Sequence, residues 1–147
     1  MTLGTLALTW SWLQVVARRG RRRPMKIGDL AARSGLSHDT LRWYEKIGLL
    51  PRPPRSSSGH RDYDPAILAW IEFLGRLKVT GMPISQMLAY ARLREQGEAT
   101  LGERRQMLEA HRQVVRQRIA DLQSSLAHLD AKIHHYATLE TRHDPGP

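Results

Sequence analysis

The sequence predicts a mainly α-helical protein with two short helices, a basic loop, a helical pair and one long C-terminal helix. Phe, Trp and Tyr make up only 6% of the residues, so the apolar content is mainly Leu, Ile, Ala and Val, a mixture that favours helices. Apolar residues recur at helical spacing through much of 27–91. From Leu101 to Tyr136 an apolar residue recurs at every seventh position, as in a coiled coil.

The 147 residues suffice for one modest domain with an extension, and their formal charge of +9 is concentrated toward the N-terminus. Residues 1–24 carry five arginines, and residues 25–61 carry seven basic and three acidic residues. Residues 62–147 carry eleven of each sign. This distribution would attract polyanions to the N-terminal part, although a generically basic surface has the same composition.

The chain has no cysteine, which excludes disulfides, thiolate metal sites and cysteine redox chemistry and is consistent with a cytoplasmic location. We expect four segments. They are an N-terminal extension (1–24), a domain made of the first two helices, the basic loop and the helical pair (25–96), a coiled-coil helix (97–136) and a tail (137–147).

The extension has an apolar run, 1–17, followed by the basic stretch RRGRRRP. This order is the reverse of a secretory signal, and the run is shorter than the ~20 residues of a membrane span. We interpret 1–24 as a disordered arm or as the product of a start codon assigned upstream of Met25. The alternative is a basic arm that adds phosphate contacts.

A helix-turn-helix is predicted over 27–47. Gly35 interrupts the helical spacing, Ser37 suits an N-cap and Asp39 suits the first turn of the second helix. On one side of that helix His38, Arg42 and Lys46 are spaced by four, where they could meet DNA or simply face solvent. The apolar positions are Ile27, Leu30, Ala31, Leu41, Tyr44 and Ile47.

Residues 49–63 contain three prolines, three serines and a glycine, which exclude a helix. Leu49–Leu50 and Tyr63 could anchor a small β-hairpin with its turn in the Ser/Gly stretch. A flexible linker is the alternative. The basic residues here are Arg52, Arg55, His60 and Arg61.

The segment MKIGDLAARSGLSHDTLRWYEKIGLLPRPPRSSSGHRDYD resembles the N-terminal DNA-binding region of the MerR family. The family's threonine-leucine-arginine, aromatic pair and glutamate match residues 40–45, and its glycine-leucine-leucine matches 48–50. Its wing pattern of glycine-tyrosine-arginine-x-tyrosine matches 59–63, except that His60 replaces a tyrosine. Trp43 also replaces a common tyrosine. The resemblance continues through residue 96 and more loosely to about 136.

The resemblance implies a winged helix-turn-helix that binds DNA. Arg42 and Tyr44 would contact the DNA backbone from the recognition helix, and Arg61 would do so from the wing. Tyr63 would either join them or anchor the wing in the core. The other expected DNA-binding residues are Ser37, His38, Thr40, Lys46, Arg55 and His60.

A helical pair should follow the wing. Asp64-Pro65 reads as an N-cap with proline in the first turn, and this helix should end by Gly81. The second helix follows Pro83, where the family often has a serine. The two apolar stripes are Ile67, Trp70, Ile71 and Leu74, then Ile84, Met87, Leu88 and Ala91.

The long helix carries a narrow apolar seam that one helix cannot bury alone, so it needs a partner. Arg105 and Arg112 interrupt the early part of the seam, and a straight helix from Leu101 to Tyr136 would span about 50 Å. The resemblance implies an antiparallel two-helix coiled coil between two protomers. The expected dimerisation residues are Leu108, Val115, Ile119, Leu122, Leu126, Leu129, Ile133 and Tyr136.

The resemblance also implies a mechanism: a homodimer distorts double-stranded promoter DNA so that RNA polymerase engages both promoter elements. An effector would act without thiols, and the options are a small molecule near the junction of the DNA-binding domain and the long helix, a histidine-based metal site, or no effector. We expect no cofactor, no metal and no membrane association. No recognised catalytic motif is present, so we do not expect an enzyme. An architectural DNA-binding protein or a helical adaptor is the alternative. The histidines weighed as metal ligands, and judged solvated or interfacial, are His111, His128, His134 and His135.

Overall fold

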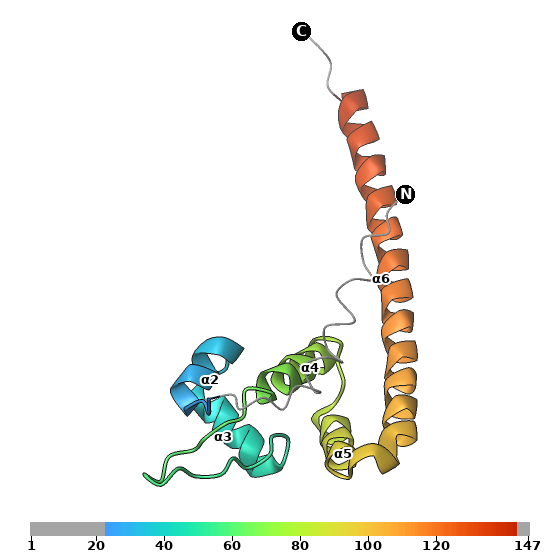
Figure 1. Cartoon of the computed structure of the whole chain (residues 1–147). Helices are drawn as coiled ribbons and strands as arrows, with labels where there is room; N and C mark the ends of the chain where they lie inside the picture. The colour runs from blue at the N-terminus through green and yellow to red at the C-terminus, as the bar shows by residue number, and fades with distance from the viewer. Residues whose placement is uncertain (1–22, 144–147) are drawn as a thin grey trace, which may run out of the picture. The chain divides into compact units, whose positions relative to one another are not determined.

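The computed structural model describes residues 23–143, and within them all regular secondary structure is helical, as predicted (Figure 1). The predictions for residues 1–22 and 144–147 therefore lie outside the described residues. No helix of the described part is both long and apolar enough to cross a membrane. The elements are α2 (Ile27–Ser34), α3 (His38–Ile47), α4 (Ile67–Val79), α5 (Ile84–Glu95), the 3-10 helix η1 (Gly97–Thr100) and α6 (Leu101–His143). The chain divides between Arg104 and Arg105 into two compact units.

Local sequence signals fix both ends of α3. Ser37 is the N-cap, and its Oγ accepts a hydrogen bond of 3.1 Å from the Thr40 backbone N–H, as the sequence predicted. Gly35 and Gly48 end α2 and α3 in the left-handed conformation, with φ of 72° and 86°. Since only glycine adopts this conformation without a steric cost, the two glycines set the length of each helix.

The wing, residues 51–63, differs from the predicted β-hairpin. It is a hairpin-shaped loop with two isolated antiparallel bridges, Arg55 with Arg61 and Met25 with Tyr63. Three prolines in its first arm have no N–H to donate, so a continuous ladder cannot form there. The second arm of the wing pairs instead with Met25, whose backbone exchanges two hydrogen bonds of 2.9 Å with the backbone of Tyr63.

The predicted N-cap of α4 at Asp64 is wrong, because the helix begins at Ile67 with Ala66 in the N-cap position, and the two residues before Ile67 form a turn instead. The Asp64 carboxylate accepts from the Ala66 N–H at 2.9 Å, and the Asp64 carbonyl accepts from the Ile67 N–H. The helix ends at Val79, and Gly81 follows with φ of 83°, in agreement with the predicted stop.

The helical pair packs through an aromatic cluster. Tyr90 stacks on Trp70 with ring centroids 6.0 Å apart and contacts Phe73 at 5.6 Å. The predicted stripe of α4 is buried, but that of α5 is partly wrong, because Ile84 is 42% exposed and Tyr90 is buried instead. Ile84 is the first residue of α5, and the buried side chains of this helix begin only with Met87 and continue with Tyr90.

The long helix α6 continues to His143, so the tail predicted from residue 137 was placed too early. Residues 137–143 contain no glycine or proline that would end a helix. No residue of α6 is buried in the single chain, and Leu122 is 70% exposed. Its exposed seam residues are Ile119, Leu122, Leu126, Leu129, Ile133 and Tyr136, whereas Leu108 and Val115 are half-buried.

Candidate DNA-binding site

The exposed side of α3 carries the cations that the sequence predicted. His38, Arg42 and Lys46 are all exposed, whereas Leu41 faces the core. Arg42 approaches the carboxylate of Asp39 at 3.7 Å, but both side chains are exposed, so water weakens this pair. The Arg42 guanidinium therefore remains available to a stronger anion such as a phosphate.

Cations from three separate segments meet beside α3. They line a hollow of about 420 Å³, and its basic side chains comprise one residue preceding α2, one from α3 and three from the wing. We call these residues the basic face: Lys26, Arg42, Arg55, His60 and Arg61. Neighbouring guanidinium and ammonium groups on one face provide the electrostatics and the donors that a phosphate backbone requires.

Lys26 belongs to the basic face, although it was not among the residues predicted from the sequence. It is the N-cap residue of α2, and its ammonium pairs with the Asp62 carboxylate of the wing. The only signal in the sequence was its position directly before a helix of the predicted helix-turn-helix. Its proximity to the wing depends on the bridge between Met25 and Tyr63, which no local pattern indicated.

A buried carboxylate joins the recognition helix to the wing. Glu45 is only 7% exposed, and its two oxygens accept hydrogen bonds from Arg61 Nε, at 3.0 Å, and from the Tyr63 hydroxyl. The two donors lie 16 and 18 positions further along the chain. Because a buried carboxylate needs such partners, the position of the wing relative to α3 is coupled to Glu45.

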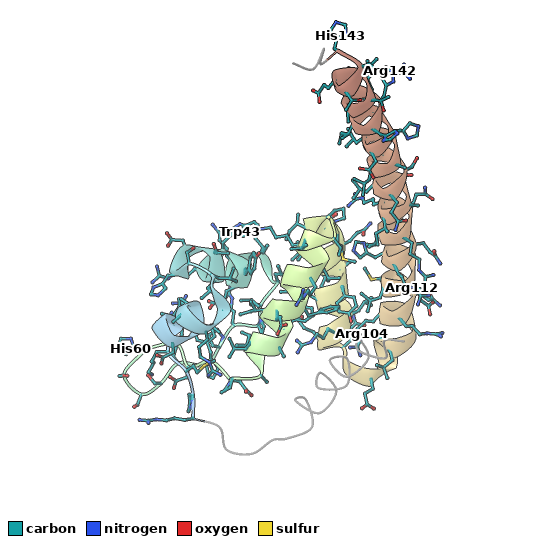
Figure 2. All side chains as sticks on the ribbon, turned by 90° about the horizontal axis from the view of Figure 1, so that it is seen from above. Trp43, His60, Arg104, Arg112, Arg142 and His143 are labelled. Carbon is teal, nitrogen blue, oxygen red and sulfur yellow. The ribbon has the colours of Figure 1, made fainter. Side chains whose placement is uncertain are left out.

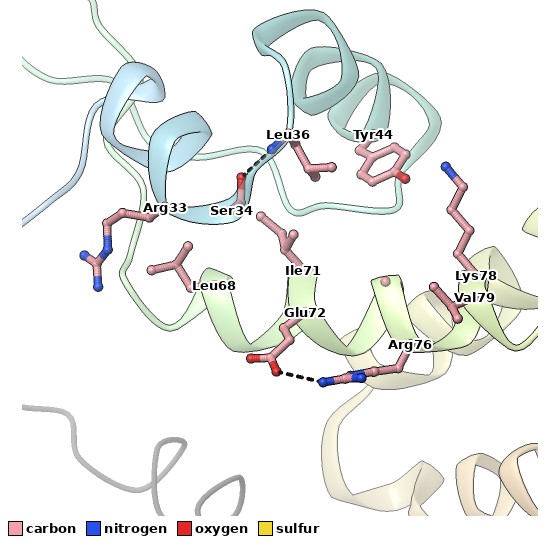
Figure 3. A pocket seen from close by; sticks show the side chains of 11 residues that line it. Arg33, Ser34, Leu36, Tyr44, Leu68, Ile71, Glu72, Arg76, Lys78 and Val79 are labelled. Atoms are coloured by element: carbon pink, nitrogen blue, oxygen red, sulfur yellow. Dashed lines mark hydrogen bonds and ion pairs between the residues drawn. The ribbon is translucent and has the colours of Figure 1, made fainter.

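Tyr63 lies in the core at 1% exposure, where it anchors the wing and has no surface to offer to DNA. Tyr44 is likewise 6% exposed. Its ring lines a second hollow, of about 540 Å³, between α3 and α4 (Figure 3). Tyr63 therefore has the core position that was one of its two expected roles, and Tyr44 is packed as well, while the DNA contact of Tyr44 stays a prediction.

Titration of Tyr63 gives a test of this burial. Burial, followed by the hydrogen bond and the charge of Glu45, raises the pKa of Tyr63 above its usual value. The unfolded chain releases that proton near pH 10 but the folded chain retains it, so the stabilisation present below about pH 10 is lost as the pH rises. We expect the stability of the native protein to fall more steeply above about pH 10 than that of Tyr63→Phe, by up to about 1.4 kcal/mol per pH unit. Parallel urea unfolding curves at pH 9 to 11 measure the difference, and equal slopes would contradict it.

The remaining predicted side chains lie at the start of α3 and on the wing. The hydroxyls of Ser37 and Thr40 are 2.9 Å apart and are used in the N-cap. Arg55 donates from Nη1 to the Gly59 carbonyl at 2.9 Å, which stiffens the wing turn, and His60 is exposed on the same loop (Figure 2). Ser37 and His60 are therefore accessible, whereas Thr40 is half-buried.

The histidines of α6 do not converge on a metal site within residues 23–143, where no three His, Cys, Asp or Glu side chains are grouped for one. His128, for example, is engaged locally through its Nδ1 and the Ser124 carbonyl, at 2.8 Å.

Two family models match consecutive parts of the chain: "MerR family regulatory protein" over residues 26–63 and "MerR, DNA binding" over residues 68–132. The HTH-type transcriptional regulator AdhR of Bacillus subtilis is 38% identical over 60% of this chain and 64% of its own length. An HTH-type transcriptional regulator of Haemophilus influenzae is 35% identical over 72% of this chain and 78% of its own. The match to AdhR thus spans less than two thirds of that relative.

Solved structures show the same fold. The crystal structure of a MerR family transcriptional regulator from Listeria monocytogenes has a TM-score of 0.72 and 37% identity, covering 78% of this chain and 86% of that one. HiNmlR, a MerR family regulator lacking the sensor domain and bound to promoter DNA, has a TM-score of 0.70 and 31% identity, covering 80% and 94%. Since the two family models together span the helix-turn-helix, the wing, the helical pair and most of α6, this chain belongs to the MerR family of regulatory proteins.

Proposed function

We propose that the protein is a homodimeric transcription regulator that binds promoter DNA in the cytoplasm and distorts it in response to an effector. The observation that carries the proposal is the basic face, where Arg42 of the recognition helix and Arg61 of the wing line one hollow. A helix beside a basic loop is suited to reading a groove while holding the flanking phosphates. The bound promoter DNA in the HiNmlR structure supports the same use of this fold.

The homodimer is supported by the unpaired seam of α6. A row of side chains such as Leu122, Leu126 and Ile133 is more than half exposed in the single chain. An exposed apolar row of this length is costly in water and is typical of a helix that packs on another helix. A second copy would also supply a second recognition helix, so that the complex could read a pseudo-palindromic site.

Footprinting on the DNA upstream of the protein's own gene, with transcription measured in parallel, tests the proposal. A protected pseudo-palindrome between the two promoter elements, with altered transcription, is the expected result. RNA polymerase would then respond to the changed shape of the promoter. Deforming that DNA costs free energy, which the contacts of the protein with the DNA would offset. Specific binding without any effect on transcription would indicate an architectural protein, and a dimer that fails to bind DNA would indicate a helical adaptor.

Arg55→Ala tests whether the wing neutralises DNA phosphates. Arg55 is exposed and forms no ion pair among the described residues, so its removal should cost only the hydrogen bond to the Gly59 carbonyl in the wing turn and leave the rest of the fold intact. We expect weaker binding to all DNA sequences, and the slope of log affinity against log salt concentration should decrease by about 0.9 for each phosphate that is no longer neutralised. Arg61→Ala should lower the slope too, but it also leaves Glu45 without its cation. An unchanged slope for Arg55→Ala would exclude Arg55 from the phosphate contacts.

A further inference from the structure

A third hollow, of about 260 Å³, lies at the base of the wing, apart from the basic face. Its lining residues include the wing prolines, Trp70 of α4, and the two arginines Arg52 and Arg94. Small-molecule sites usually measure about 300–1,000 Å³, so this cavity suits a compact, single-ring occupant. Its lining therefore offers both apolar and cationic side chains.

Two carboxylates also line the cavity, but both already have partners. Asp62 pairs with Lys26, whereas Asp64 accepts a hydrogen bond from the Ala66 N–H and forms no ion pair within residues 23–143. The two arginines have no such partner, since neither Arg52 nor Arg94 takes part in an ion pair within residues 23–143. With Asp62 balanced by Lys26, the two arginines and the one remaining carboxylate, Asp64, leave the wall with a net charge of +1.

Arg94 is held in an unusual position for an unpaired cation. Its guanidinium carbon lies 4.5 Å from the centroid of the Trp70 ring, a cation–π contact. Burial, with a smaller contribution from the charge of Arg104, lowers the pKa of Arg94, because desolvation disfavours the charged guanidinium. An anion beside Arg94 would offset that cost.

We infer that the cavity at the base of the wing binds a small organic anion of the aromatic carboxylate class. The carboxylate would pair with the guanidinium of Arg94, and the ring would pack against the prolines of the wing. The part of this inference that makes the cavity the effector site of a regulator rests on the proposed function.

The cavity is connected to both DNA-contacting elements. Trp70 Nε1 donates to the carbonyl of Leu49, at 2.9 Å, just beyond Gly48 at the end of α3. Tyr63, in the same wall, donates to Glu45 of α3. An occupant would therefore touch side chains that are bonded to the recognition helix and to the wing, and it could favour one arrangement of the two by binding it more tightly.

Calorimetric titration of the full chain with benzoate, in the absence of DNA, tests the site, with benzyl alcohol as the ring without a carboxylate. We expect saturable binding of benzoate in the micromolar to millimolar range and none of benzyl alcohol. Arg94→Gln should weaken benzoate binding by at least about tenfold. Arg92→Gln, an exposed change on the same helix, should leave it unchanged, and Arg52→Gln should weaken it without disturbing the Trp70 contact.

Absence of saturable binding, equal binding of the alcohol, or affinity unchanged by both Arg94→Gln and Arg52→Gln would overturn the site. In a second titration, benzoate should change the affinity for the footprinted DNA by at least about threefold. Unchanged DNA affinity with benzoate bound would overturn its role as an effector site. Failure to bind DNA without any ligand would instead overturn the proposed function.

Discussion

Leu122→Asp should convert the protein into a monomer and abolish specific DNA binding at nanomolar concentrations. In a dimer the change removes two leucines from the seam, each contributing about 2 kcal/mol of burial, and puts two carboxylates in their place. The dimer dissociation constant should therefore rise at least about a thousandfold. Sedimentation velocity across a concentration series measures it, and the fold of the single chain should be retained in circular dichroism because Leu122 is 70% exposed there.

Ser124→Asp is the matched control. It introduces the same charge two positions away, on the side of α6 opposite the seam, where the residue is exposed. This variant should remain a dimer and bind DNA normally. If Leu122→Asp also remained dimeric, the seam would not be the dimer interface, and the surface that pairs the protomers would have to be sought on the first compact unit.

Glu45→Ala should destabilise the first compact unit and uncouple the wing from the recognition helix. The change leaves the buried Tyr63 hydroxyl without an acceptor and Arg61 without its carboxylate. We expect a loss of about 2–3 kcal/mol in the free energy of unfolding, mainly from Tyr63, since the side chain of Arg61 is one third exposed and water screens its share. DNA affinity should fall further than stability alone explains, because Arg61 loses the group that orients it.

Chemical denaturation of Glu45→Ala beside Glu72→Ala separates a buried from an exposed carboxylate. Glu72 pairs with Arg76 at 3.9 Å on the exposed side of α4, so its loss should cost no more than about 0.5 kcal/mol. Comparable losses in the two variants would show that the bonds of Glu45 to the wing contribute little, and the wing would then be positioned by its backbone bridges.

The sequence predicted the parts of the site that depend on local signals. Ser37 and Gly48 bound α3 because a cap and a left-handed residue are encoded within a few positions. The helical period placed Arg42 on the exposed side. The bonds of Glu45 could not be predicted in this way, because its partners are 16 and 18 positions away and their meeting depends on how the wing folds back.

The same limit explains the errors in detail. Helical spacing admits both Ile84 and Tyr90 of α5 as core positions, and only the position of Trp70 on the neighbouring helix selects Tyr90. Helical spacing placed Tyr44 on the apolar side of α3, where it lines the hollow beside α4 (Figure 3), and its contact with DNA stays a prediction. The antiparallel pairing of α6 stays a prediction, since a single helix has the same seam in either direction.

The backbone bridge between Met25 and Tyr63 determines how far the N-terminus can be shortened and whether a tag can be fused there. Met25 both donates to and accepts from Tyr63, at 2.9 Å each, although it precedes the first helix. A version starting at Met25 would keep both bonds, whereas one starting at Ile27 would lack the backbone against which the second arm of the wing is held. An affinity tag is therefore better placed after His143, because any group fused directly to Met25 would emerge beside the surface that is to meet DNA.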